Sequence, residues 1–173
     1  MSKKQRKEQC QLAWGLLVNG HIPMVLVSTV DQHIQTILNQ IIDGIASIGI
    51  QLILVQPREE ETLKQCLDWQ QKHPESIKVV TPQEADETIY DMEILEDVTV
   101  DKLKELRDRQ LVPVAESGKV EPFDPIEERG NGFLFQKGNP WSLLVELVRA
   151  KETYRFPYDW RNVVRGSRQD LIP

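Results

Sequence analysis

The sequence contains few cysteines and histidines, and neither residue type is spaced to hold a metal ion. Only two cysteines occur among the 173 residues. Cys10 and Cys66 both fall at apolar positions of predicted helices, which favours buried thiols over a disulfide or a metal pair. His21, His33 and His73 lie far apart and form no metal-ligand pattern. We therefore expect no metal site, and no known cofactor-binding motif is present.

Positive charge and long apolar runs are also scarce. The chain has 27 acidic and 21 basic residues, which gives a net charge of −6. An acidic chain is unfavourable for binding nucleic acid or an anionic membrane, so we expect neither as a partner. The polar N-terminus lacks the apolar core of a signal peptide, and no run approaches the length of a transmembrane helix. The sequence predicts a single cytoplasmic domain over residues 1–173 that buries its own core.

Short apolar runs alternate along the chain with helical patterns. Such alternation indicates βαβ units and a parallel sheet. We predict an α/β fold, a Rossmann-like doubly wound parallel sheet of five to six strands with helices on both faces. The strand near Ile94 is ambiguous, and the strand order is 3-2-1-4-5-6 if the last run is the sixth strand. The five clear strands are Met24–Val27, Leu52–Val55, Ile77–Val80, Leu111–Ala115 and Phe133–Phe135.

The strongest helical pattern follows the first strand and ends at Gly49. Its apolar residues recur at the i, i+3, i+4, i+7 spacing of one helix face. We expect this helix to be packed on the sheet through that face. The residues are Ile34, Ile37, Leu38, Ile41, Ile42, Ile45 and Ile48.

Weaker patterns predict the other helices. Residues 3–17 place Cys10, Ala13, Trp14 and Leu17 on one face, and residues 59–72 do the same with Leu63, Cys66 and Leu67. Thr81, Pro82 and Glu84 have the pattern of an N-cap, a first-turn proline and a capping-box acid, so we predict a short helix that ends near Tyr90. Further helices are predicted from Val100, Leu103 and Leu106, after Asn139 and Pro140, and over Tyr158–Gly166. Ser117–Glu128 is predicted to be a loop.

Two groups of residues have competing interpretations. The acidic residues between positions 86 and 97 could form a cation site, but we interpret them as a solvated edge. Trp141 and Trp160 could stack on sugars, but we interpret them as packing anchors. The acidic residues are Asp86, Glu87, Asp91, Glu93, Glu96 and Asp97.

The stretch Arg129–Ala150, RGNGFLFQKGNPWSLLVELVRA, has the form G-x-G-F-x-F followed by a helix. This pattern resembles the C-terminal end of bacterial glycogen synthases and plant starch synthases. The segments KEQCQLAWGL, PMVLVSTVDQH, QLILV, TIYD, LVPVAESGKV and YDWRNVVRGSRQDL resemble that family's segments in the same order. The chain as a whole resembles, in degenerate form, the C-terminal Rossmann-like domain of these GT-B glycosyltransferases.

The resemblance implies a sugar-nucleotide site from which charge has been lost. In the family, an arginine and a lysine of the segment S-R-L-x-x-Q-K-G hold the diphosphate. After Ser28, Thr29 stands at the place of the arginine and His33 at the place of the lysine. Threonine is uncharged and histidine is mostly neutral at pH 7. The resemblance therefore implies that the fixed positive charge of the diphosphate site is absent.

The family's E-P-x-G-L segment and its T-G-G turn are only partly kept. Glu96 retains the acid of the first segment, and Ser117 and Gly118 followed by Lys119 retain part of the second. The proline and the glycine of the first segment are lost, so the close backbone approach that glycine allows is lost too. The resemblance implies Glu96 as a vestigial catalytic residue. It implies degenerate phosphate-binding positions at Ser28, Thr29, His33, Ser117 and Gly118.

Two functional hypotheses follow from the resemblance. In the first, the domain is catalytically inactive and has a structural, regulatory or assembly role, as a homo-oligomer or beside a partner glycosyltransferase subunit. In the second, it is a glycosyltransferase half that binds ADP-glucose or UDP-glucose, weakly through its altered site, and is completed by an acceptor domain from another chain. The four departures from the family pattern, counting the absent acceptor half, favour the first hypothesis.

Overall fold

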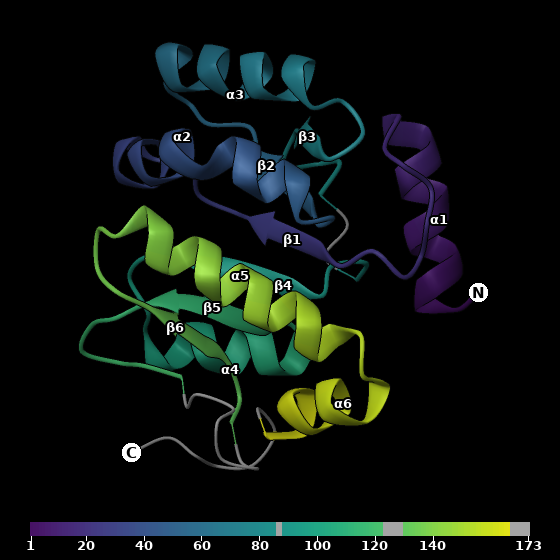
Figure 1. Cartoon of the computed structure of the whole chain (residues 1–173), viewed down its shortest axis with the longest axis vertical. Helices are drawn as coiled ribbons and strands as arrows, with labels where there is room; N and C mark the ends of the chain where they lie inside the picture. The colour runs from purple at the N-terminus through teal and green to yellow at the C-terminus, as the bar shows by residue number, and fades with distance from the viewer. Residues whose placement is uncertain (86–87, 123–129, 167–173) are drawn as a thin grey trace. The chain divides into compact units, whose positions relative to one another are not determined.

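A computed structural model describes residues 1–85, 88–122 and 130–166 of the chain. Six parallel strands form one sheet in the order β3-β2-β1-β4-β5-β6, which confirms the predicted Rossmann-like fold and strand order (Figure 1). The chain divides into two compact units, Met1–Tyr90 and Asp91–Pro173, each of which we describe by itself. No helix among the described residues is long and apolar enough to cross a membrane.

The first unit contains β1 (Met24–Val27), β2 (Gln51–Val55) and β3 (Ile77–Val80). Their register places Met24 opposite Gln51 and Leu52 opposite Ile77. All residues of β1 are buried, as expected for a strand covered on both faces. The predicted strands of this unit are confirmed, and β2 begins one residue earlier than the apolar run indicates.

Helix α2 (Gln32–Ser47) follows β1, and α3 (Glu60–Lys72) follows β2. The predicted apolar face of α2 is buried from Ile34 to Ile45. On α3, by contrast, Leu67 is 45% exposed, and the buried side chains include Cys66 and Trp69. The prediction for the face of α3 is therefore only partly correct, because the face is rotated toward Trp69, the largest apolar side chain of the helix.

The two helices are also joined at their surface by an exposed ionic contact. The carboxylate of Asp43 accepts a hydrogen bond from Lys72 Nζ at 2.6 Å and lies 2.7 Å from His73 Nε2. The hydrogen bonds from Lys72 and then His73 hold the pKa of Asp43 below its ordinary value.

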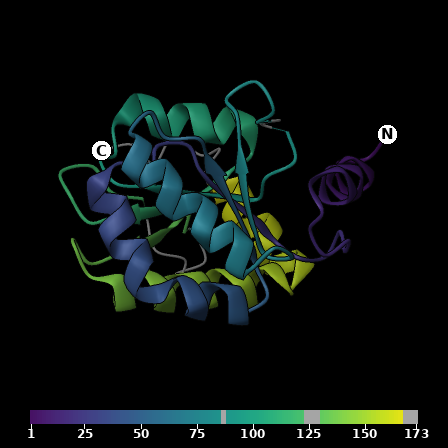
Figure 2. The same cartoon turned by 90° about the horizontal axis from the view of Figure 1, so that it is seen from above.

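Helix α1 (Lys3–Trp14) packs through polar side chains, contrary to the predicted apolar face. Both views show it to one side, away from α2 and α3 (Figures 1 and 2). Its buried residues are Lys7 and Gln11, while Ala13 and Leu17 are exposed. Gln11 Nε2 donates to Gln51 Oε1 at 2.7 Å, and Lys7 Nζ donates to the carbonyl of Ile22 at 3.1 Å. The apolar prediction was wrong because hydrogen-bond partners at the start of β2 and in the loop before β1 orient the helix.

The segment after β3 forms a turn, and the predicted helix ending near Tyr90 is absent from the described residues 81–85 and 88–90. The capping box does form, since Glu84 N donates to Thr81 Oγ1 at 3.3 Å and Thr81 N donates to Glu84 Oε2 at 2.8 Å. Among the described residues the turn does not continue as a helix, because residues 82–85 supply no apolar face to pack against the core. The hydrogen bonds between Thr81 and Glu84 thus close a single turn.

The second unit contains β4 (Met92–Leu95), β5 (Val112–Glu116) and β6 (Phe133–Phe135). The ambiguous segment at Ile94 is therefore a strand. Met92 lies opposite Val112, and Val114 opposite Phe133. A Cβ atom at Gly132 would lie 2.6 Å from Pro113 Cγ. Glycine is thus required where β6 begins beside β5.

Helices α4 (Val100–Arg109), α5 (Pro140–Tyr154) and α6 (Pro157–Gly166) complete this unit. Asn139 caps α5 by accepting from Ser142 N at 3.1 Å, as predicted. The prediction that Trp141 is a packing anchor is wrong, since the side chain is 62% exposed. Val145 and Val148 follow it along the exposed face of α5. The other face of α5 already contacts β5 and β6.

The interpretation of the acidic residues as a solvated edge is wrong at two positions. Asp91 is 3% exposed and Glu93 is fully buried. Burial and then the adjacent Asp91 carboxylate raise the pKa of Tyr154, whose ring packs edge-on against Trp160 at 5.1 Å. Trp160 is thus a packing contact, as predicted. The positions 86 and 87 lie outside the described residues, as do 123–129 of the predicted loop.

Candidate functional site

In the first unit, Ser28, Thr29 and His33 lie between the end of β1 and the first turn of α2. Parallel α/β sheets bind ligands at this edge, where strands end and helices begin. The amide of Ile34, one of the free donors of the first turn, is taken by Asp31, the N-cap, whose Oδ1 accepts at 2.9 Å. A carboxylate therefore stands where a phosphate would otherwise meet the helix N-terminus.

No fixed positive charge accompanies these residues in the sequence. Residues 8–57 contain neither lysine nor arginine. Counted from Ser28 without a gap, the lysine of the family segment falls on Ile34, which is 2% exposed. Whether His33 or Ile34 is aligned with that lysine, the position lacks a permanent cation.

In the second unit, Glu96 follows β4, while Ser117 and Gly118 follow β5. Because β4 and β5 are neighbouring parallel strands, the three residues lie at the same edge of the sheet. Glu96 is half-buried, and Gly118 is exposed. The structure thus brings these three predicted site residues to one region, and Ser28, Thr29 and His33 to another within their own unit.

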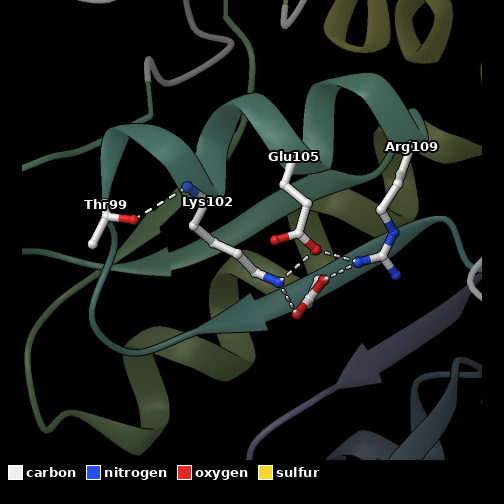
Figure 3. A network of polar contacts seen from close by, with 5 residues as sticks. Thr99, Lys102, Glu105 and Arg109 are labelled. Carbon is white, nitrogen blue, oxygen red and sulfur yellow. Dashed lines mark hydrogen bonds and ion pairs between the residues drawn. The ribbon is translucent and has the colours of Figure 1, made fainter.

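An ionic network centred on the buried Glu93 holds α4 against β4 and fixes the path of the chain that carries Glu96. Lys102 Nζ lies 3.1 Å from Glu93 Oε1, and Arg109 Nη1 lies 3.9 Å from Glu93 Oε2. Both cations also contact Glu105, at 3.2 Å and 2.7 Å (Figure 3). Thr99 caps α4 by accepting from Lys102 N at 3.1 Å. Residues 96–98 are therefore held between a fixed strand end and a fixed helix start.

The network also affects the ionisation of Glu105. Burial alone would raise the pKa of this carboxyl, but hydrogen bonds from Arg109 and Lys102 outweigh burial and lower the pKa. Glu105 therefore remains an anion that balances the two cations.

The turn at Ser117 and Gly118 is engaged within the chain. Ser117 Oγ accepts from Lys137 N at 3.1 Å, and Gly118 N donates to Glu121 Oε1 at 3.1 Å. The preceding Glu116 is 1% exposed, and its Oε1 accepts from Gly138 N at 2.7 Å. Carboxylates of the chain itself thus accept hydrogen bonds from backbone amides that follow two strands of this unit, β5 and β6.

Three of these carboxylates were missed by the sequence reasoning. The sequence does contain a signal for Asp31, because an aspartate directly before an apolar periodic run is a common helix N-cap. No sequence pattern indicates the roles of Glu116 and Glu121, because their partners, the amides of Gly138 and Gly118, are set by the arrangement of the chain after β5 and β6. No group of three His, Cys, Asp or Glu side chains among the described residues is arranged to hold a metal ion.

Comparison with known proteins finds distant similarity to glycogen synthases and to a starch synthase. No protein-family model matches the chain. The glycogen synthase of Clostridium acetobutylicum is 26% identical over 186 aligned residues, which cover 98% of this chain and 39% of that protein. A glycogen synthase of Gloeobacter violaceus is 45% identical over 49 residues, or 28% of this chain and 11% of that protein.

A solved structure shows the same fold. The catalytic domain of starch synthase IV from Arabidopsis thaliana, bound to ADP and acarbose, matches 96% of this chain and 38% of its own, with a TM-score of 0.73 and 17% identity. The chain thus has distant similarity over nearly its whole length to glycogen synthase. It spans about two fifths of the length of the relatives that match it end to end.

Proposed function

We propose that this glycogen synthase-like GT-B domain does not transfer glucose and has a structural, regulatory or assembly role. The observation that carries the proposal is that backbone amides beyond the strand ends already donate hydrogen bonds within the chain. Amides after β1, β5 and β6 donate to carboxylates of the chain itself, namely Asp31, Glu121 and Glu116. These are the groups that a bound diphosphate would use.

The charge of the β1–α2 segment itself also opposes a diphosphate. Asp31 places a negative charge at the N-terminus of α2, and no lysine or arginine occurs between residues 8 and 57. Charge-assisted hydrogen bonds contribute roughly 1.5–3 kcal/mol each. Loss of two such contacts is enough to weaken a micromolar ligand to the millimolar range.

An assembly role is supported by apolar side chains that the chain leaves exposed. Trp141, Val145 and Val148 are 62%, 56% and 38% exposed and follow one another at helical spacing along α5. A second group, Leu12 and Leu17, lies at the end of α1 with exposures of 72% and 51%. Exposed apolar side chains that gather on one face, as the helical spacing on α5 indicates, are typical of protein interfaces. The partner we propose is a second copy of the chain or a glycosyltransferase subunit.

The alternative is a glycosyltransferase half that binds a sugar nucleotide and is completed by another chain. Its support is the pair of exposed lysines beside Ser117. Lys119 follows the turn directly, and Lys137 donates its amide to Ser117 Oγ. These two ammonium groups could neutralise a phosphate at the end of β5.

Calorimetric titration with ADP, ADP-glucose and UDP-glucose separates the two functions. We expect no binding below millimolar ligand, and micromolar binding would contradict the inactive domain. The variant Thr29→Arg with His33→Lys should gain at least tenfold in affinity for ADP. The matched control places the same two charges one turn later, at the exposed Thr36 and Asn39 of α2. Equal behaviour of both variants and the parent would show that the two family positions are wrongly assigned.

Light scattering tests the assembly role in the same preparations. A mass above that of the monomer, lost on Trp141→Ser, would support self-association through α5. A monomer that also fails to associate with a full-length glycogen synthase would contradict the assembly role.

A further inference from the structure

Among the described strands, β3 is the last at one side of the sheet, next to β2. In a parallel pair, a strand directs the backbone groups of alternate residues at its neighbour. The carbonyls of Ser76 and Val80 accept hydrogen bonds at 2.8 Å from amides of β2 and of the residue that follows it. The amides of Ile77, Val79 and Thr81 therefore point away from β2, toward the outer edge of the sheet.

All three of these outward amides donate to acceptors of the first unit. Ile77 N donates to His73 O at 2.9 Å, and Val79 N donates to Gln70 Oε1 at 2.7 Å. Thr81 N donates at 2.8 Å within the capping turn described above. Gln70 is the acceptor at the middle of the strand, and it belongs to a different element, α3.

The segment 76–81, SIKVVT, has the composition of a strand that pairs readily. It contains three β-branched apolar residues and one charge, that of Lys78, and it lacks proline and glycine. The edge of such a strand is a template for a strand of another chain unless charge, proline, a bulge or a covering element blocks it. A strand added beside β3 would need the outward amides as donors.

We propose that Gln70 is an edge guard, which keeps a strand of a second copy of the chain from adding to β3. Its side-chain carbonyl occupies the amide of Val79, the central donor of the edge. The buried side chains of Cys66 and Trp69 hold α3 in place, so this acceptor is fixed beside the strand. Copies of the chain are thereby prevented from extending their sheets, whether or not the domain transfers glucose.

The experiment compares variants of the full chain that all carry Trp141→Ser, so that association through α5 does not contribute. We expect the mass of Gln70→Leu, which keeps the bulk but removes the acceptor, to rise with concentration in light scattering. Gln71→Leu is the matched control, because Gln71 is exposed and receives the same apolar side chain one position later. Gln70→Glu retains an acceptor oxygen and should remain monomeric.

Amide hydrogen exchange locates the association. In dilute Gln70→Leu, the amide of Val79 should exchange roughly fivefold faster than in Trp141→Ser alone, as for the loss of one hydrogen bond. In concentrated solution, the added strand should protect the same amide again. Faster exchange that concentration does not reverse would overturn the proposal.

A second variant guards against misfolding of the first. Gln70→Ala removes the acceptor without adding a large apolar side chain, and its mass should also rise with concentration. The proposal would be overturned if Gln70→Leu associated no more than Gln71→Leu, or if it associated while Gln70→Ala remained monomeric.

Discussion

Replacement of the buried Glu93 by glutamine should lower the free energy of unfolding by about 2–4 kcal/mol. Glu93 is fully buried, and it lies 3.1 Å from Lys102 Nζ and 3.9 Å from Arg109 Nη1. Glutamine keeps the shape but removes the charge, so two cations whose side chains are only 24% and 16% exposed lose their buried anion. Breaking a buried pair costs about 3–5 kcal/mol, and the remaining Glu105 reduces that figure.

Urea unfolding followed by circular dichroism measures this difference. The matched control is Glu105→Gln, since Glu105 contacts the same two cations but its side chain is 49% exposed, and we expect a loss of at most about 1 kcal/mol. Replacing all three charges, with Glu93→Leu, Lys102→Met and Arg109→Met, should be nearly neutral because no buried charge is then left alone. If Glu93→Gln costs no more than Glu105→Gln, the reasoning from burial is refuted.

Three further predictions concern the first unit. Ile41→Ala and Ile42→Ala should each cost about 2–5 kcal/mol in denaturant melts, because both side chains are at most 5% exposed; losses below about 1 kcal/mol, like that of the exposed Gln40→Ala control, would place this face of α2 at the surface. The pKa of Asp43 is lowered in the folded state, so its contribution to stability is present above the ordinary carboxyl pKa and disappears as pH falls through the lowered value. The unfolding free energy of Asp43→Asn should therefore fall less steeply than that of the parent as the pH is lowered below about pH 4. The same steepness in both proteins would contradict the contact of Asp43 with Lys72 and His73. Burial raises the pKa of Cys66 to about 12, so an aromatic disulfide reagent at pH 8 should modify this thiol only after unfolding, and rapid modification of the native protein would be inconsistent with its burial.

The strands were predictable because apolar runs buried on both faces have few alternative conformations. Met24–Val27 and Phe133–Phe135 appear with the predicted bounds. The apolar face of the helix from Ile34 to Ile45 was equally predictable, because a helix with one apolar face packs on a sheet through that face.

The errors occurred where polar contacts between distant segments decide the outcome. The face of α1 is set by Gln11 and Gln51, which are 40 positions apart, and no local pattern reports such a pairing. Glu93 appeared solvated because its cationic partners lie on the following helix. For the site, the sequence indicated where positive charge was lost. It did not indicate that the carboxylates of Asp31 and Glu116 accept hydrogen bonds from the backbone amides of Ile34 and Gly138.

The polar attachment of α1 has a consequence for how this helix separates from the rest of its unit. Apolar surfaces can slide past one another by small steps, but hydrogen bonds have direction and fixed partners. A shift of α1 by one turn would leave the buried side chains of Lys7, Gln11 and Gln51 without the acceptors and donors they now meet. The attachment therefore has a single register and is all-or-none. Because the buried side chains of α1 itself, Lys7 and Gln11, are polar, its detachment should carry a smaller heat-capacity change than the release of a helix with an apolar face.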